Sequence, residues 1–414
     1  MDDELRAVNH YKRSIKMDST TTAPAAPPTP LTAHLTSASD SGESYTPPTG
    51  IHLGREQVKW NEDVWERIDR AVHDESQRTR VAAKFLPQYR VDPHTTTVPA
   101  DTVLGLPTSS VTTTPLPMNI DEGSFIRLVE IWVEFSLTAA QVQKESELLA
   151  GQPGKNGQQG DHAAHPASTA VTLARRATNT LGLAQDTVIF QGLNAFYPLG
   201  KNFPLLGSNL FSNGTVQSRA GNPPQLSLLP LDGGLLCLGG TNNIDASSSQ
   251  VLKVNQITPP APPAPQVVAY STNTVAQIDA AVAYLASTGY AGPYVTVLHF
   301  YPYADSMAPI ANTLILPADR IKPLMEAGYF SSSTIGGLPN QNPPNPPQLT
   351  GSTPPQAYGL VISLGGNTVD LVNGLDPVTA FSLVDSTGNF TFRVLTRFAL
   401  RLKDSGSVIR LEFQ

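Results

Sequence analysis

The chain has 414 residues, of which 37 are proline and 31 are glycine, and only 15% are charged. Its formal net charge is −7 and no block of lysine and arginine occurs, which argues against nucleic acid as the main partner. The single cysteine, Cys237, excludes an internal disulfide. The acidic start predicts no secretion signal, and proline and glycine interrupt the most apolar stretch, 226–238, so we expect a cytoplasmic protein without a membrane span.

The first 49 residues predict an extension rather than part of a core. Residues 17–49 consist mainly of serine, threonine, proline and alanine, with almost no large apolar side chain, and such a composition cannot bury enough apolar surface to fold. Residues 1–16 place Leu5, Val8 and Ile15 at helical spacing. A helix of that length would be marginal by itself.

The first strong helix signal begins at Asn61, which is a suitable N-cap and is followed by two acidic residues. Trp65, Ile68 and Val72 are spaced to lie on one helical face. We expect this helix to cover 65–85.

Residues 87–117 change to valine, threonine and proline with few charges and alternate like strands. This pattern predicts a long hairpin-like β arm. Such an arm has too few neighbours in its own subunit to bury itself, and exposed strand edges invite aggregation. We therefore expect it to pair with an adjacent subunit. The next strand is expected over 125–135, with Phe125 and Val129 on the same face.

A long buried helix is predicted after Ser168, a candidate N-cap. Its apolar stripe carries only the charges of Arg175 and Arg176. Gly182 costs this helix about 1 kcal/mol relative to alanine, so tertiary packing must stabilise it. A short apolar run, 186–192, is expected to follow the helix.

The remaining pattern mixes helices and strands, and predicts the α+β class. Further helices are expected over 138–150, 275–287 and 318–327, and further strands over 292–298, 359–365, 369–372, 379–384, 390–403 and 408–413. No repeat of fixed period is visible, which argues against a solenoid or propeller.

Several short motifs in sequence order together resemble the encapsulins, bacterial shell proteins with the HK97-type fold of tailed-phage capsids. The motifs are Leu53-Gly54-Arg55, Trp65-Glu66-Arg67-Ile68-Asp69, Arg78 to Phe85, Asp186 to Gly192, Gly292-Pro293-Tyr294, Val369-Asp370-Leu371, Asp376 to Phe381 and Phe390 to Leu395. The resemblance covers 51–190 and 275–412. The chain departs from the family by its N-terminal extension and by added segments at 151–165, 193–267 and 331–357.

The resemblance implies a division of the chain into the parts of an HK97-type subunit. These parts are a flexible extension (1–50), an N-terminal helical segment (51–86), an extended loop (87–120), a peripheral domain with a spine helix that continues into the apical domain (121–192 and 268–300), an apical insertion (193–267), an apical and peripheral region with a proline-rich insertion (301–357) and a β-rich C-terminal segment (358–414).

The resemblance also implies a function. Such a protein assembles with itself into a closed icosahedral nanocompartment and encloses a cargo protein, for example a peroxidase or a ferritin-like protein. By position, Trp65, Ile68 and Val72 lie on the helix that would contact the cargo peptide, although the same side chains could simply pack the helix on its own domain. A pore loop would fall within 221–243, lined by Asp232, Gly239, Gly240, Thr241, Asn242 and Asn243.

Catalytic chemistry is not supported by the sequence. The Asp-His-Ala-Ala-His segment at 161–165 has no fourth ligand nearby for zinc, the glycine-rich run 233–240 lacks the phosphate-loop spacing, and Cys237 has no basic neighbour to lower its pKa. We therefore expect no enzyme activity, cofactor or metal. Two alternatives stay open. One is a phage major capsid protein that packages DNA, which the basic residues in 12–16 keep possible, and the less favoured one is a soluble enzyme.

Overall fold

A computed structural model of the chain describes residues 53–104, 119–150, 168–192, 210–211, 214–218, 234–236, 251–255, 270–310, 314–335 and 357–413. All of these belong to one compact unit, Tyr45–Gln414, whereas the other unit is Met1–Ser44. The expectations for the N-terminal extension, for the 151–165 segment and for most of the 193–267 and 331–357 insertions lie outside the described residues.

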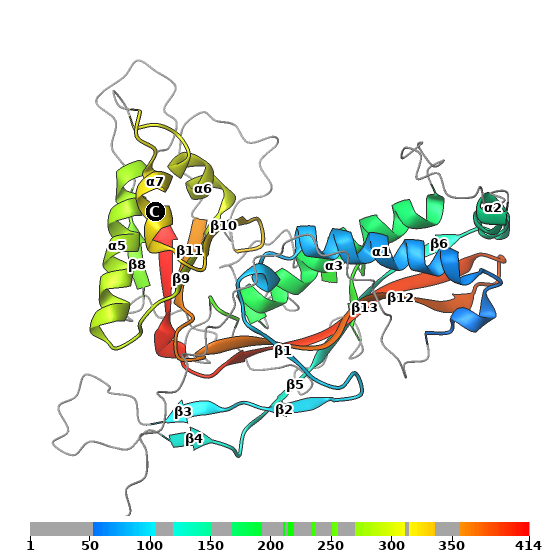
Figure 1. Cartoon of the computed structure of the whole chain (residues 1–414), viewed down its shortest axis with the longest axis horizontal. Coiled ribbons are helices and arrows are strands. Elements are labelled where there is room, and N and C mark those ends of the chain that lie inside the picture. Colours follow the sequence, from blue (N-terminus) through cyan, green and yellow to red (C-terminus); the bar gives the residue numbers. More distant parts are fainter. Residues whose placement is uncertain are drawn as a thin grey trace, which may run out of the picture. The chain divides into compact units, whose positions relative to one another are not determined.

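The first of two five-stranded sheets has the strand order β1–β12–β13–β6–β7 (Figure 1). Strands β12, β13, β6 and β7 are antiparallel neighbours, and β1 joins the edge in parallel with β12. The strands are β1 (Gln88–Arg90), β12 (Val369–Val384), β13 (Phe390–Leu402), β6 (Val129–Leu137) and β7 (Gln217–Ser218).

Strand β12 corrects the prediction of two separate strands at 369–372 and 379–384, because it runs unbroken through both. Its register against β13 shifts between Asn373 and Leu375 and again between Leu375 and Val378. Gly374 and Pro377 lie at these shifts, and bulges are where a sheet tolerates both residue types. The break in the sequence pattern therefore marks an irregular ladder and not the end of the strand.

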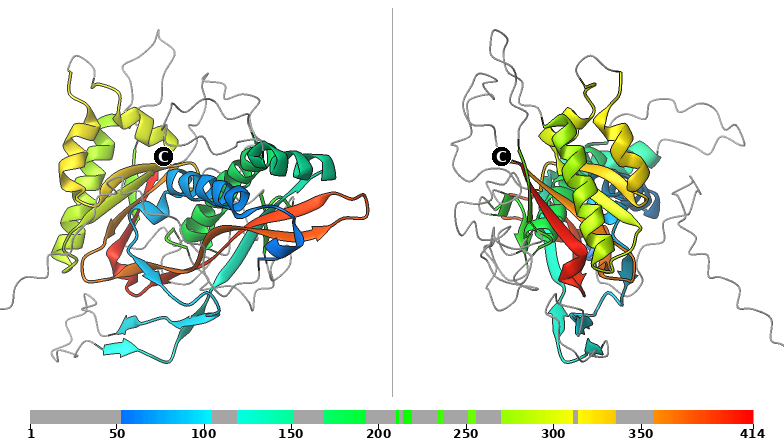
Figure 2. Two further views of the ribbon diagram at one scale, coloured as in Figure 1. Left: turned by 45° about the vertical axis from the view of Figure 1, so that its right-hand side comes forward. Right: turned by 90° about the vertical axis from the view of Figure 1, so that its left-hand side faces the viewer.

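Helices α1 (Glu62–Thr79) and α3 (Thr169–Gln191) pack against each other and against the first sheet, and α2 (Ala139–Ala150) contacts both helices (Figure 2). The two predicted N-caps are confirmed: the Asn61 side chain accepts a hydrogen bond from the Val64 N–H, and Ser168 accepts one from Val171. Such caps stabilise a helix by about 1 kcal/mol each.

Two helix boundaries differ from the prediction. Helix α1 ends at Thr79, well before residue 85, and a separate 3₁₀ turn covers Ala82–Lys84. Helix α3 continues to Gln191 and includes the apolar run that was expected to follow it. The run is apolar on every side because this end of the helix is buried all round.

The strand expected over 125–135 is divided at Leu128. Strand β5 (Phe125–Arg127) pairs with β2 (Thr97–Pro99), whereas β6 pairs with β13. Phe125 is 66% exposed, so the prediction that it shares a buried face with Val129 was wrong. The alternation continues through the division in sequence, which conceals the change of partner.

The second sheet has the order β10–β9–β11–β14–β8, and helix α5 packs on it through β8 and β11 (Figure 2). Its strands are β10 (Gly328–Ser332), β9 (Tyr294–His299), β11 (Ala357–Ser363), β14 (Val408–Phe413) and β8 (Val251–Val254), and its helices are α5 (Ser271–Ser287), α6 (Phe300–Ser306) and α7 (Pro317–Ile321). The α+β class is confirmed.

One hydrophobic core passes from the first sheet into the second. It includes Ile131 and Phe392 of the first sheet together with Val297, Leu360 and Val408 of the second, all of them buried. The two sheets therefore fold as one cooperative body. No helix in the described part of the chain combines the length and apolar character needed to cross a bilayer.

Helices α1 and α3 cross closely at Gly182. A Cβ atom built on Gly182 would lie 2.5 Å from the Thr79 hydroxyl oxygen and 3.2 Å from the Thr79 Cβ. That hydroxyl donates a hydrogen bond to the Glu75 carbonyl oxygen, so it cannot turn away without losing the bond. The glycine that weakens the helix locally is thus required by the packing.

We therefore expect Gly182→Ala to destabilise the chain by about 1–3 kcal/mol, because overpacking outweighs the gain in helix propensity. Thermal unfolding of the purified protein measures the effect. Arg176→Ala, on the exposed face of the same helix, is the control and should change little. An alanine variant at 182 as stable as the parent would contradict a tight crossing.

Candidate assembly interface

A two-part β arm leaves the first sheet between β1 and β6 (Figure 1). Its inner part pairs β2 with β5, and its outer part pairs β3 (Thr102–Leu104) with β4 (Asn119–Asp121), both antiparallel. Among the described residues neither pair has a third strand. An isolated two-stranded ladder is marginally stable in water, so the arm needs other contacts.

The inner part of the arm is anchored on the first sheet. Val98, Ala100 and Ile126 are at most 3% exposed and pack with Val372 and Ala399 of the sheet. Further along the chain, in contrast, Ile120 is 50% exposed and Phe125 is 66% exposed. The arm therefore carries one buried apolar face and large apolar side chains that nothing in the described chain covers.

Arg401 of β13 fixes the point where the arm leaves the sheet. Its guanidinium binds the Asp370 carboxylate through Nε and Nη2, at 2.9 and 2.7 Å, and its Nη1 lies 2.5 Å from Asp101 Oδ2. Lys403 Nζ also contacts Asp370, at 2.9 Å. Buried ion pairs of this kind cost about 3–5 kcal/mol when one partner is removed.

Asp101 joins the inner and outer parts of the arm and has an unusual backbone. Its φ is 51°, in the left-handed region that residues other than glycine rarely occupy. Aspartate tolerates this conformation better than most residues. The ion pair with Arg401 therefore acts on the residue whose backbone sets the direction of the outer arm.

A second junction lies where α1 ends and the chain turns toward the arm. The buried carboxylate of Asp186, on α3, accepts hydrogen bonds from the Val81 and Ala82 N–H groups at 2.7 and 3.0 Å. Burial raises the pKa of Asp186 to about 7, although these two bonds and the Arg80 guanidinium act in the opposite direction. The same arginine lies 3.6 Å from Asp376 of β12.

The Leu-Gly-Arg and Trp-x-x-Ile-Asp motifs meet in an ion pair. Arg55 binds Asp69 of α1 through both guanidinium nitrogens, at 2.8 and 2.7 Å, and donates to the Thr379 carbonyl oxygen of β12. Its guanidinium also lies 4.7 Å from the centre of the Trp65 ring. Burial is the main cause that raises the pKa of Asp69. The motif residues thus connect α1 to β12.

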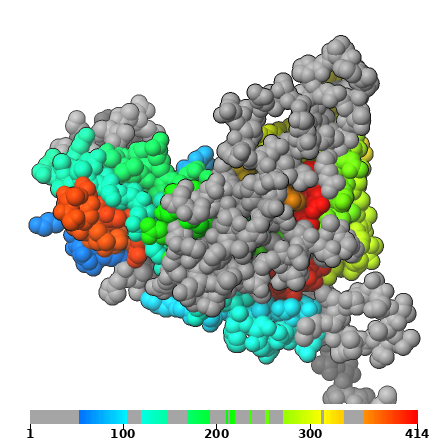
Figure 3. Space-filling view, turned by 180° about the vertical axis from the view of Figure 1, so that it is seen from behind, coloured from blue at the N-terminus to red at the C-terminus, as the bar shows by residue number. Residues whose placement is uncertain are grey.

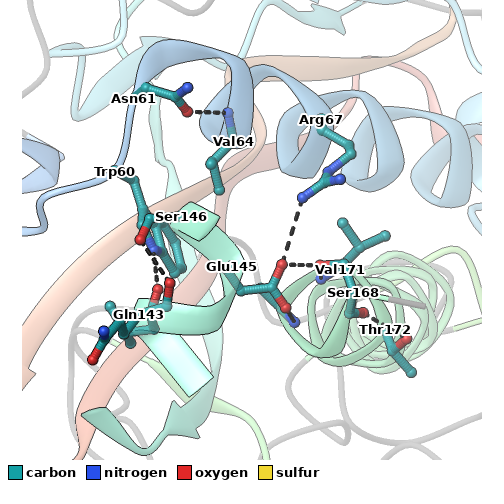
Figure 4. A network of polar contacts seen from close by, with 12 residues as sticks. Trp60, Asn61, Val64, Arg67, Gln143, Glu145, Ser146, Ser168, Val171 and Thr172 are labelled. Atoms are coloured by element: carbon teal, nitrogen blue, oxygen red, sulfur yellow. Dashed lines mark hydrogen bonds and ion pairs between the residues drawn. The ribbon is translucent and has the colours of Figure 1, made fainter. Parts of the chain in front are cut away.

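Glu145 joins all three helices of the first sheet (Figure 4). Its carboxylate accepts hydrogen bonds from the Ser168 hydroxyl at 2.6 Å and the Ala170 N–H at 3.1 Å, and it lies 3.5 Å from Arg67 of α1. A negative charge at the start of α3 is stabilised by the helix dipole. Nothing in the sequence pattern of α2 distinguished this glutamate, because its partners are 23 and more residues away.

The three candidate cargo residues lie inside the core. Trp65, Ile68 and Val72 are 6%, 1% and 0% exposed, and the Trp65 ring is 6.1 Å from that of Phe392. The packing interpretation accounts for all three. Contact with cargo stays a prediction.

The six candidate pore residues, and the two histidines of 161–165, lie outside the described residues. The neighbouring Gly-Leu-Leu step is described and is buried: Leu235 and Leu236 donate backbone hydrogen bonds to Ile189 and Phe190 at the end of α3. A Cβ on Gly234 would lie 2.3 Å from the Gly192 nitrogen. In the described part of the chain no three His, Cys, Asp or Glu side chains are grouped to hold a metal ion.

No protein-family model matches the sequence, and no curated protein matches it. The chain is similar to the solved structure of a virus-like particle from Pyrococcus furiosus, with 11% identity and a TM-score of 0.45 over 84% of this chain and 98% of that one. It is also similar to the holo-SrpI encapsulin complex from Synechococcus elongatus PCC 7942, with 9% identity and a TM-score of 0.41 over 80% and 86% of the two chains.

A third similar structure is that of Mycobacterium phage Ogopogo, with 13% identity and a TM-score of 0.43 over 81% of this chain and 92% of that one. The expected likeness to encapsulins and phage capsid proteins is thus confirmed. With TM-scores below 0.5, it transfers no residue role or activity to this chain.

The raised pKa of Asp186 makes stability depend on pH in a definite direction. Because the folded pKa of about 7 exceeds the ordinary value, the folded chain holds a proton that the unfolded chain releases above about pH 4. This contribution to stability is complete below pH 4 and is lost as the pH rises through 7.

We therefore expect Asp186→Asn to flatten the fall in unfolding free energy between pH 5 and 8. Urea unfolding at both pH values measures it in the variant and the parent. Asp74→Asn, at an exposed position of α1, should keep the parent's slope. An unchanged slope in the Asp186 variant would rule out this carboxyl group as the titrating one.

Proposed function

We propose that this chain is the subunit of a closed icosahedral shell, which assembles from copies of the chain and encloses a cargo protein. Its role is structural rather than catalytic, and the cytoplasm is its proposed location. The observation that carries the proposal is the arm, which is anchored at its base by buried residues and ion pairs but exposes large apolar side chains beyond that base.

The physical argument starts from what the arm lacks. Ile120 and Phe125 expose half or more of their surface, and burying such a side chain contributes about 1.5–3 kcal/mol. A rigid anchor removes the alternative of folding the arm back on its own sheet. A surface of a second copy of the chain satisfies both the apolar side chains and the strand edges.

The other parts of the proposal follow the division implied by the sequence motifs. Residues 87–120 serve as the extended loop, and 193–267 belong to an apical domain with the proposed pore loop within 221–243. Cargo binds on the lumenal wall. On α1 the side chains exposed for such a contact are polar, for example Glu66 and Arg70, because the apolar ones are buried.

The second candidate within the same architecture is a phage capsid protein that packages DNA. Lys12, Arg13 and Lys16 in the N-terminal extension favour it, since basic side chains neutralise phosphate. The formal net charge of −7 favours protein cargo instead.

The assembly role is tested by the double substitution Ile120→Asp and Phe125→Asp. We expect variant subunits that unfold at the parent's temperature but elute as small species and show no shells by negative-stain electron microscopy, because two charges replace the apolar contact. The matched control is Ile120→Val with Phe125→Leu, which should still assemble. Normal shells from the aspartate variant would overturn the role given to the arm.

The two kinds of content are separated by the particles themselves. For shells purified from the native host, we expect an absorbance ratio typical of protein and a second polypeptide that co-elutes and is identified by mass spectrometry. An absorbance maximum near 260 nm that nuclease fails to remove from intact particles would support the DNA-packaging alternative and contradict protein cargo.

A further inference from the structure

The first described residues of the chain already run beside an edge of β12. The Phe381 N–H donates to the Leu53 carbonyl oxygen at 2.8 Å, and the Arg55 side chain reaches the Thr379 carbonyl oxygen two residues earlier on the strand. Residue numbers therefore increase in opposite directions, as in an antiparallel pair. Gly54 permits this approach, because its φ is 66° and a Cβ there would lie 2.9 Å from the Phe381 oxygen.

Beyond Phe381 this edge of β12 has no other strand in the part of the chain that the structure describes. Strand β1 occupies the same edge only at Leu371, Val372 and Asn373, whereas β13 takes the opposite edge as far as Val384. Leu383 and Val384 are 49% and 50% exposed near the hairpin tip. Figure 3 shows this tip, in orange, at the surface next to the blue start of the described chain.

The chain that precedes Leu53 has the position, direction and length to fill this edge. In an antiparallel pair, residues before 53 pass along β12 toward Val384, and four residues span about 13 Å at ~3.3 Å each. Ile51 lies two positions before Leu53, so its side chain takes the same face of a strand. Leu53 packs there with Val378 and Ala380.

The sequence also sets where such pairing stops. Residues 47 and 48 are both proline, and proline cannot donate a backbone hydrogen bond to a ladder. The segment 49–52, Thr-Gly-Ile-His, lies between these prolines and the first described residue. It has the length of the uncovered edge.

We propose that residues 49–52 form an additional antiparallel strand on β12 of the same chain and cover Leu383 at the tip of the β12–β13 hairpin. The occupant is the chain's own segment because Leu53 is already hydrogen-bonded to the same strand, which holds the preceding residues at a high effective concentration. The strand closes an exposed sheet edge.

This strand determines where the extension departs. Residues 1–48 then leave the folded unit at the hairpin tip and not at the middle of the first sheet. Fully extended, 48 residues reach at most about 160–170 Å. The extension is therefore a tether fixed at the tip of a hairpin, and it can reach other copies of the chain.

Cysteine pairs test the proposal in the full-length chain. In a Cys237→Ser background, Ile51→Cys is combined in turn with Ser382→Cys, Leu383→Cys and Val384→Cys, then oxidised and run on a non-reducing gel with peptide mapping. We expect at least one pair to form a disulfide within the monomer band, because paired strands bring Cα atoms within about 4.4–6.8 Å. Ile51→Cys with Leu314→Cys, which is 96% exposed on the second sheet's side, is the negative control.

Disulfides between chains would assign the edge to a second copy and overturn the proposal, as would the absence of a disulfide in all three pairs. Hydrogen exchange of the full chain gives an independent measurement. Ile51→Pro removes a donor from the proposed ladder and should raise the exchange of the 382–384 amides about tenfold or more. Glu43→Pro, before the two prolines, should leave these amides unchanged, and equal exchange in both variants would contradict the proposed strand.

Discussion

The packing of α3 against α1 and the first sheet is the constraint on which the other parts of the molecule depend. The C-terminal half of α3 is buried nearly all round, so it can make no compensating contact with water. Gly182 admits α1, Asp186 binds the turn after α1, and the last turn receives the Leu235-Leu236 step. Three segments far apart in sequence therefore take their positions from one helix.

Charged side chains connect the layers at places where apolar packing alone would allow sliding. Arg55 with Asp69, Arg401 with Asp370, and Asp186 with two backbone N–H groups each join segments distant in sequence. Dispersion contacts tolerate small shifts, whereas a bidentate guanidinium–carboxylate pair fixes one geometry. These pairs define the register of α1 and of the arm on the sheet.

The sequence predicted the class, the helices and most of the strands, because burial on one face produces a periodic pattern and caps have local signatures. It could not predict that β5 and β6 have different partners, since alternation continues across Leu128. Nor could it identify Glu145, Arg401 or Asp186 as junctions, because their partners are distant in sequence. The motif that contains Trp65 was recognisable, but periodicity does not distinguish a core face from a binding face, and the structure places this residue in the core.

The left-handed backbone of Asp101 has a consequence for the geometry of an assembly. An arm that pairs with a different surface of the next copy makes a head-to-tail contact, which closes into a ring or continues as an open filament according to the rotation between copies. That rotation depends on the angle at which the outer arm leaves its base, which Asp101 and its ion pair with Arg401 set. Curvature, and with it the difference between a sphere and a tube, is thus encoded at a single residue.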